Sequence, residues 1–449
     1  MSVQLGREPV LSVEHLRTTF FTDKETIRAV DDISFDIRTG ETVGIVGESG
    51  SGKSVTARSI MGLVDSPGRI MGGSIRFSDE ATVDRLANRF PERTVDVDRL
   101  REDHDVVELI ERLFDRGVTP ERLTDGEYDT RDATLLVREG AVDMRDLVER
   151  GYAARLGVVD ADAFVVRDGP GGYVEITNAS KEALRALRGR GIAMIFQDPL
   201  TSLNPVYTVG NQIKEAIRLH QGKTGKAATE EAVRLLEAVS IPDARRRIGE
   251  YPHQFSGGMR QRAVIAMALA CKPQLLICDE PTTALDVTIQ AQILELLQAL
   301  QEERDLSIMF ITHDMGVIAE IANRVNVMYA GELVESAPVE ELFSRPKHPY
   351  TQGLLESIPG RNVGNDRLRT IEGDVPTPNE VPTYCRFAPR CPEAFDACDV
   401  VHPVNVDVSD SEAPHTAACL LYPDDRSREE AVAYHRERDD RATEVTDDE

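Results

Sequence analysis

One glycine-rich segment constrains the fold of this chain more than any other part of its sequence. It follows the apolar stretch Thr42–Val46 and leads into a helical pattern that begins near Lys53. Glycines in such a loop let successive backbone N–H groups point inward at phosphate oxygens, and the helix N-terminus adds its positive end. The strand, loop and helix fit the P-loop pattern and predict a nucleotide phosphate site. Its expected contacts are Gly47, Glu48, Ser49, Gly50, Ser51, Gly52, Lys53 and Ser54.

Four side chains give this predicted site its chemistry. Lys53 is expected to reach the β- and γ-phosphates, and the Ser54 hydroxyl is expected to ligate Mg²⁺. A second apolar segment, Leu275–Cys278, ends in Asp279 and Glu280, two carboxylates that are costly to bury unless a cation or a reaction uses them. Asp279 is expected to hold Mg²⁺ through water, and Glu280 to polarise the attacking water.

Strand-like and helix-like segments alternate on both sides of these motifs, which predicts an α/β fold with a mainly parallel sheet. The predicted strands lie within residues 10–37 and at residues 42–46, 192–196, 275–278, 308–312 and 325–328. Helical patterns cover residues 211–220 and 229–239. Another helix starts at Asp286 as its N-cap, with Ile289, Ile293, Leu296 and Leu300 on its apolar face.

The pattern changes over residues 80–175, which lack Lys, are rich in Asp, Glu and Arg, and contain a helical piece at Val106–Phe114 and a turn or hinge at Gly169–Gly172. They predict an inserted acidic subdomain, or else a disordered loop. Residues 1–79 and 176–335 then form the main domain, and residues 336–425 a small module with four cysteines. The charged tail, residues 426–449, is expected to be frayed or disordered.

The net charge of -26 and the pI near 4.8 indicate a surface that stays hydrated in high salt, where self-repulsion is screened. They predict a halophilic source, with an ordinary acidic protein as the alternative, and argue against nucleic acid as the main partner. No stretch approaches the roughly 20 apolar residues that span a bilayer. The longest apolar run, Ala263–Cys271, is typical of a buried helix, and Met1–Gln4 carries no secretory pattern. We therefore expect a cytoplasmic protein that acts at a membrane through partner chains.

Four further motifs now point to one family. Phe255–Arg262 resembles the ABC signature LSGGQ, with Phe for Leu and Met for Gln. Gln197 lies in a segment that resembles the Q-loop, Ile195-Phe196-Gln197-Asp198-Pro199. Asp286 closes Ala284-Leu285-Asp286, which looks like the D-loop, and His313 looks like the switch histidine. Over residues 10–79 and 176–335 the chain therefore resembles the ATPase domain of ABC transporters, with its helical signature subdomain.

The resemblance implies a head-to-tail dimer that encloses two ATP molecules. Ser256, Gly257 and Gly258 would contact the γ-phosphate held by the partner's P-loop, since they open a helix and have no second role in their own chain. Gln197 would ligate Mg²⁺ and transmit nucleotide state to the membrane partner. His313 would contact the γ-phosphate, although a lone histidine is more often a core residue. An aromatic ring, Phe20 or Phe21, would stack on adenine or lie in the core.

Three shorter segments narrow the resemblance to oligopeptide/dipeptide importer ATPases: Tyr251-Pro252-His253-Gln254, Thr201-Ser202-Leu203-Asn204-Pro205 and His348-Pro349-Tyr350-Thr351. This group implies two permease subunits, an extracytoplasmic solute-binding protein and a second ATPase chain, and its members also move nickel or sugars. An ABC ATPase acting on DNA or ribosomes is the alternative, but no basic stripe or second ATPase half is present. The insertion departs from the family pattern and puts contacts with the permease in doubt.

The C-terminal module contains Cys385, Cys391, Cys398 and Cys419, separated by five, six and twenty residues. Four cysteines in a reducing compartment favour metal over disulfides, and the absence of CxxC pairs disfavours a zinc knuckle. Members of the resembled group carry four such cysteines that look able to bind an iron–sulfur cluster, and four thiolates can hold [4Fe–4S]. Zinc, a disulfide or free thiols stay open. Cys271 and Cys278 are expected in the interior of a helix and a strand.

Overall fold

The computed structural model describes residues 9–197, 202–283, 285–358, 371–409 and 413–439. Several residues of the predicted motifs and termini lie outside these ranges: Met1–Gln4, Asp198, Pro199, Thr201, Ala284 and residues 440–449. The chain divides into two compact units. Unit 1 consists of Met1–Ser74 and Arg188–Glu449, and unit 2 is Ile75–Leu187. Unit 2 thus extends beyond the expected insertion, residues 80–175, at both ends.

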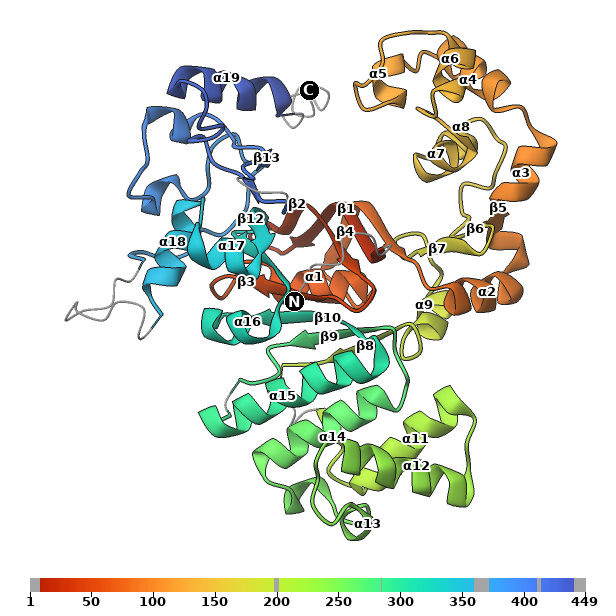
Figure 1. The fold of residues 1–449 in the computed structure, drawn as a ribbon, viewed down its shortest axis with the longest axis vertical. Helices are drawn as coiled ribbons and strands as arrows, with labels where there is room; N and C mark the ends of the chain where they lie inside the picture. Colours follow the sequence, from red (N-terminus) through yellow and green to blue (C-terminus); the bar gives the residue numbers. More distant parts are fainter. Residues whose placement is uncertain (1–8, 198–201, 284, 359–370, 410–412, 440–449) are drawn as a thin grey trace. The chain divides into compact units, whose positions relative to one another are not determined.

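Unit 1 is built on a sheet in which five consecutive strands are parallel, in the order β11-β3-β10-β9-β8, with β8 at the edge (Figure 1). They are β3 (Thr42–Val46), β8 (Ile192–Ile195), β9 (Leu275–Asp279), β10 (Ser307–Thr312) and β11 (Arg324–Tyr329). Beyond β11 the sheet continues antiparallel with β12 (Glu332–Pro338), β14 (Thr416–Ala417) and β13 (Val406–Asp407). The prediction of an α/β fold with a mainly parallel sheet is confirmed.

The register of this sheet decides where the site lies. Ile311 of β10 pairs with Ile45 of β3 on one side and with Asp279 of β9 on the other. Since all three strands are parallel, the residues that follow them meet at the same carboxyl-terminal edge. These are the glycine-rich loop after Val46, the residues after Asp279, and His313. This edge is where α/β folds bind their ligands.

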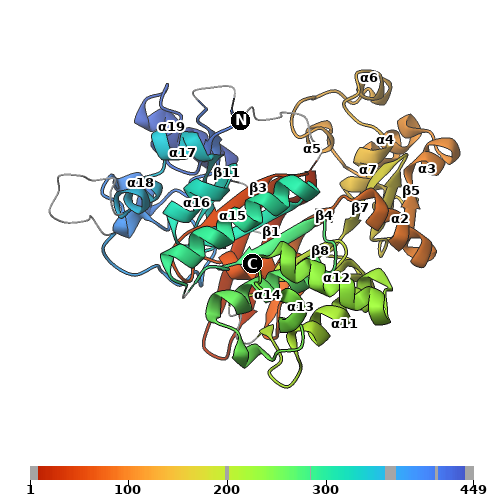
Figure 2. The same ribbon diagram turned by 60° about the horizontal axis from the view of Figure 1, so that its bottom comes forward.

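Helices cover the sheet because their apolar faces need a partner. α15 (Val287–Arg304) starts at the N-cap Asp286, whose side chain accepts from the N–H of Ile289, and it buries Ile293, Leu296 and Leu300 as predicted. Each such side chain contributes about 1.5–3 kcal/mol when fully buried. α16 (Met315–Ile321) packs on β3 and β10, and Figure 2 shows it between α15 and α17 (Val339–Ser344).

A helical group follows β8 in unit 1, and Figure 1 shows its members gathered together. They are α11 (Val209–Gln221), α12 (Gly225–Ala238), α13 (Ala244–Arg247), the short 3-10 turn η2 (Pro252–Gln254) and α14 (Gly257–Leu269). The predicted buried run Ala263–Cys271 lies mostly in α14, with Ala263 and Ile265 fully buried. Cys278 lies inside β9 as expected, but the prediction for Cys271 is wrong: it follows the end of α14 and is half-buried. No described helix is both long and apolar enough to cross a membrane.

The remaining elements of unit 1 flank the sheet. They are the hairpin strands β1 (Pro9–Phe21) and β2 (Thr26–Arg38), the start of β4 (Gly68–Phe77), α1 (Lys53–Ile60), α18 (Pro349–Glu356), the 3-10 turns η3 (Ala388–Arg390) and η4 (Asp396–Asp399), and α19 (Arg428–Arg438). The expectation of a frayed tail is wrong for residues 428–438, because Ser427 and Glu430 form a capping box that starts α19.

Unit 2 has apolar cores of its own, around Leu109, Leu113 and Leu147 in one cluster and Leu86 and Phe164 in another. Residues 80–175 therefore lie in helices and strands rather than in a disordered loop. The strands are the end of β4, β5 (Thr94–Asp96), β6 (Val165–Asp168) and β7 (Gly171–Glu175). The helices are α2 (Glu80–Arg89), the turn η1 (Pro91–Arg93), α3 (Val97–Asp103), α4 (Val106–Asp115), α5 (Pro120–Leu123), α6 (Ala133–Arg138), α7 (Met144–Glu149), α8 (Tyr152–Arg155) and α9 (Lys181–Leu187).

Candidate active site

The glycine-rich loop connects β3 to α1, and two of its glycines cannot be replaced without a clash. A Cβ atom at Gly47 would lie 2.2 Å from the carbonyl oxygen of Met328, and one at Gly52 would lie 2.3 Å from that of Ala29. Both residues also have positive φ, at 153° and 103°. The loop is therefore pressed against neighbouring backbone in a conformation that only glycine adopts freely.

Lys53 is the cation of this loop and is almost completely buried, with 5% of its surface exposed. Its ammonium donates to the carbonyl oxygens of Gly47 and Glu48, at 2.8 Å each, and lies 3.4 Å from Ser51 Oγ. Burial lowers the pKa of Lys53, against the attraction of Glu280 and Asp279. An ammonium whose hydrogen bonds go to neutral oxygens favours an added anion, because a charged acceptor gives the stronger bond.

Ser54, in the first turn of α1, lies beside Asp279 at the end of β9. The Ser54 hydroxyl donates to Asp279 Oδ1 at 2.8 Å. Burial raises the pKa of Asp279, the Ser54 hydrogen bond lowers it, and the neighbouring Glu280 carboxylate raises it again. A hydroxyl and a buried carboxylate are hard oxygen donors of the kind Mg²⁺ takes, so these residues fit the cation that the P-loop pattern implies.

Glu280 is the centre of a second set of contacts. Its carboxylate accepts from Gln197 Nε2 and Thr283 Oγ1, both at 3.0 Å, and lies 3.3 Å from His313 Nδ1. Burial would raise the pKa of Glu280, but the hydrogen bonds from Thr283, His313 and Gln197 outweigh it and keep the pKa below its usual value. Glu280 has a φ of 49°, a left-handed conformation that non-glycine residues adopt rarely and that is common at functional sites.

An open cleft joins these two sets of contacts in unit 1. It is lined by Gly47, Glu48, Ser49, Gln197, Glu280, His313, Leu354, Gly373, Asp374 and Val375. The structure thus brings together the loop, Gln197, Glu280 and His313, which the sequence places far apart. Ser256, Gly257 and Asp286 are not among the lining residues.

The signature residues and Asp286 have structural roles of their own. Ser256 is the N-cap of α14 and accepts a hydrogen bond from the N–H of Met259, which corrects the expectation that it has no role in its own chain. Gly258 is required where α14 approaches Ile289, because a Cβ atom there would lie 2.6 Å from that side chain. Both Ser256 and Gly257 are nevertheless exposed to solvent.

Of the two aromatic candidates for adenine, only Phe21 presents its ring to solvent, with 44% of its surface exposed. Phe20 is half-buried and packs against Gly68. The sequence analysis missed two groups of residues at the site. Leu354 and the segment Gly373–Val375 line the cleft. Thr283, Tyr350 and Arg390 hydrogen-bond to Glu280 or Glu48. Tyr350 lies in a motif that resembles the family, but nothing in the sequence around Arg390 or Gly373 indicates a contact with the loop.

The four predicted cysteines gather in the C-terminal part of unit 1. Cys385, Cys391, Cys398 and Cys419 are free thiols that line one small cavity of about 20 Å³, which a prediction from spacing could not establish. Burial raises the pKa of all four, that of Cys419 to about 12. Within the described ranges, no three His, Cys, Asp or Glu side chains are close enough to hold a single metal ion.

Comparison with known proteins agrees with these motifs. Residues 30–146 and 168–283 match the family described as ABC transporter, and residues 334–398 match the one described as oligopeptide/dipeptide transporter, C-terminal region. A putative peptide import ATP-binding protein of Brucella abortus is 41% identical, over 93% of this chain and 98% of its own length. The oligopeptide transport ATP-binding protein AppD of Bacillus subtilis is 40% identical over the same shares. The chain therefore belongs to the ATP-hydrolysing subunits of ABC transporters, in the group that carries the oligopeptide/dipeptide transporter C-terminal region.

Proposed function

We propose that this chain hydrolyses ATP to drive the import of di- or oligopeptides through permease subunits, at the cytoplasmic face of the cell membrane. The observation that carries the proposal is the cleft itself, where Glu280, Gln197, His313 and the loop bonded to the Lys53 ammonium converge from four separate segments. The names of the two relatives support peptides as the solute. The partners we propose are two permeases, a solute-binding protein and a second ATPase chain.

The residues of the cleft divide the chemistry between them. Lys53 and the loop N–H groups would bind the β- and γ-phosphates, and Phe21 would stack on the adenine. Ser54, Asp279 and Gln197 would hold Mg²⁺, which neutralises charge on the phosphates. Glu280 would accept a proton from the attacking water, because hydrogen bonds to its carboxylate favour the ionised form that a base needs. His313 would orient Glu280 and contact the γ-phosphate.

A second copy of the chain, or a related one, would complete the site. Ser256 and Gly257 are exposed at the start of α14, away from the cleft of their own chain. The N–H groups of Gly257 and Gly258 lie in the first turn of this helix, where backbone N–H groups and the helix dipole attract anions. We propose that they contact the γ-phosphate bound by the partner's loop.

The test of the catalytic assignment is Glu280→Gln. This variant should bind MgATP with the affinity of the unmodified chain but hydrolyse it at least ~100-fold more slowly, and it should accumulate as a dimer with ATP bound. Hydrolysis rates and gel filtration in MgATP measure both effects. Glu302→Gln, on the exposed end of α15, is the matched control. Full turnover by Glu280→Gln would remove Glu280 from its role as base.

We propose a [4Fe–4S] cluster for the four cysteines. The support for this proposal is that four free thiols line one small cavity, and four thiolates are the ligand set of such a cluster. An anaerobic preparation should be brown and contain about four irons per chain. A colourless protein with stoichiometric zinc would contradict this.

The charge of -26 supports a further proposal, that the protein works in high salt. Its unfolding temperature should rise steeply with KCl, because added ions screen the repulsion among its carboxylates.

A further inference from the structure

The side chain of Glu48, in the middle of the phosphate loop, is held by a residue from the far end of the chain. Arg390 donates to both carboxylate oxygens, through Nη1 at 2.8 Å and Nη2 at 3.0 Å. The Arg390 side chain is 5% exposed and that of Glu48 is 32% exposed. A two-pronged guanidinium–carboxylate pair of this kind fixes orientation as well as charge.

Arg390 is itself held by contacts on its other groups. Its Nε donates to the carbonyl oxygen of Glu372 at 2.9 Å, and Nη1 lies 3.3 Å from the hydroxyl of Tyr329. Its guanidinium also lies over the ring of Tyr329, 5.7 Å from the centroid. In addition, the backbone N–H of Glu48 donates to the hydroxyl of Tyr350 at 2.9 Å. Both the main chain and the side chain of Glu48 are thus fixed by residues that follow the last parallel strand.

The segment that carries Arg390 begins and ends at cysteines of the four-thiol cavity. Arg390 is the last residue of η3, which lies between Cys385 and Cys391. The N–H of Ala388 donates to the carbonyl oxygen of Cys385 at 3.0 Å, and the N–H of Cys391 donates to that of Ala388 at 3.2 Å. A short hydrogen-bonded turn of this kind transmits a displacement of Cys391 to the neighbouring Arg390.

Electrostatics give this link a consequence for ATP. Glu48 lies in a loop built to cradle an anion, where an unpaired carboxylate would repel the phosphates. Arg390 pairs with both oxygens of that carboxylate and thereby neutralises its charge. We propose that Arg390 is a positioning residue for the phosphate loop, and that through Glu48 it couples the four-cysteine site to ATP affinity. This inference rests on the proposed ATPase function.

The first experiment compares Arg390→Met with Arg428→Met. Arg428 lies in the same C-terminal region, over the ring of Phe395, and makes no described contact with the loop. Arg390→Met should raise the KM for ATP and the Kd for MgATP roughly tenfold, with kcat changed less than about threefold. Arg428→Met should change neither constant. Calorimetric titration with MgATP and steady-state hydrolysis by the full chain provide both readouts.

A double variant separates charge repulsion from a general structural defect. Glu48→Gln combined with Arg390→Met leaves no unpaired carboxylate, so the Kd should return to within about threefold of the unmodified chain. The positioning role would be overturned if Arg390→Met left the Kd for MgATP unchanged. It would also be overturned if the Kd of the double variant rose by the product of the increases seen in the two single variants. If Arg390→Met does not fold, Arg390→Lys takes its place, since it keeps the charge but loses the fork and should give an intermediate Kd.

The coupling to the cysteines has its own test. Cys391→Ser should raise the Kd for MgATP in the unmodified chain but add nothing in the Glu48→Gln, Arg390→Met background. Equal effects in both backgrounds would show that the cysteine site does not act through Arg390. Failure of the proposed function would look different, because the unmodified chain would then neither bind nor hydrolyse MgATP.

Discussion

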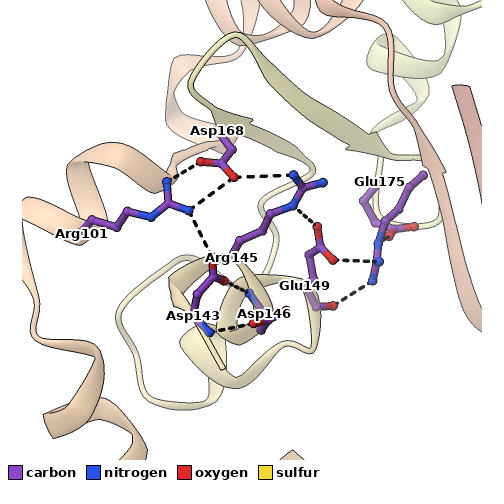
Figure 3. Close-up of polar contacts among 8 residues, drawn as sticks. Arg101, Asp143, Arg145, Asp146, Glu149, Asp168 and Glu175 are labelled. Carbon is purple, nitrogen blue, oxygen red and sulfur yellow. Dashed lines mark hydrogen bonds and ion pairs between the residues drawn. The ribbon is translucent and has the colours of Figure 1, made fainter. Parts of the chain in front are cut away.

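Two regions of the molecule use the same kinds of charged residue at strand ends for different purposes. In the cleft of unit 1, one ammonium, that of Lys53, lies near two adjacent carboxylates, those of Asp279 and Glu280. In unit 2, Arg101 and Arg145 share Asp168 at the end of β6, at contact distances of 2.5 and 3.6 Å (Figure 3). In unit 1 the two carboxylates share a single ammonium, whereas in unit 2 every acid drawn has a basic or backbone partner.

The consequences for protonation differ in the same way. Burial pushes Lys53 and Asp279 toward their neutral forms, lowering the pKa of the first and raising that of the second. In unit 2, the hydrogen bond from Arg101 to Asp168 raises the pKa of Arg101 and stabilises its charged form. Groups held away from their preferred charge state are available to bind or react, while fully paired groups hold elements together. Figure 3 shows the paired kind, joining α3 and α7 to β6 and β7.

The largest expected effect tests the cleft side of this comparison. Lys53→Ala removes the only ammonium among the residues that form the described loop, and the Kd for MgATP should rise at least ~100-fold because the phosphates lose their nearest cation. Calorimetric titration measures it. Lys226→Ala, at a 91% exposed side chain on α12, should change nothing. An unchanged Kd in Lys53→Ala would contradict the phosphate-loop assignment.

A smaller effect is expected in unit 2. Asp168→Asn weakens the contacts with both Arg101 and Arg145 and should lower the free energy of unfolding of unit 2 by about 2 kcal/mol, because its side chain is only 14% exposed. Urea unfolding, monitored by hydrogen exchange of the backbone amides in unit 2, measures this free energy.

The control for this network is Asp103→Asn, whose pair with Arg99 is exposed and should contribute at most about 0.5 kcal/mol. The rate of ATP hydrolysis should stay the same in Asp168→Asn. A fall in that rate, with unit 2 still folded, would mean that the charge network of unit 2 belongs to the function and that the comparison drawn above is wrong.

The same contrast explains what could be predicted from sequence. Lys53, Ser54 and Glu280 lie in contiguous motifs whose spacing reflects local geometry, so the strands and loops that carry them were predicted. Arg390 was not, because its contact with Glu48 joins residues 342 positions apart and no local pattern records it. The role of Ser256 as a helix cap has a different explanation: a serine that opens a helix fits both an N-cap and an anion site, and the sequence does not separate the two.

The limits of the insertion and of the C-terminal tail were also missed where they depend on contacts rather than on local composition. The expected limits of the insertion came from composition, which changes at Glu80, whereas the structural unit begins at Ile75 inside β4, where one strand serves both units. The tail was predicted to be disordered because it is charged. Its buried Ala431, Val432 and His435 give α19 an apolar side that a count of charges does not detect.

The smallest expected effect asks whether paired charges outside the cleft of unit 1 behave like those of unit 2. Glu231 on α12 accepts from Lys223 at 2.9 Å and contacts Arg234 at 2.5 Å. Burial alone would raise the pKa of Glu231, but these two partners hold it at about 2. A lowered pKa contributes stability that is fully present above the unfolded value near 4.5 and is lost as the pH falls toward 2.

Glu231→Gln should therefore lower the free energy of unfolding by about 1 kcal/mol at pH 7, a modest value because Lys223 and Arg234 are partly exposed. The difference from the unmodified chain should shrink between pH 4.5 and pH 2, when urea unfolding is measured across that range. Glu230→Gln, on the same helix and 57% exposed, should show neither effect. If the loss of unfolding free energy in Glu231→Gln does not change with pH, Glu231 stabilises the helix by packing rather than by charge. The charged groups of the two units would then be arranged alike without contributing to stability in the same way.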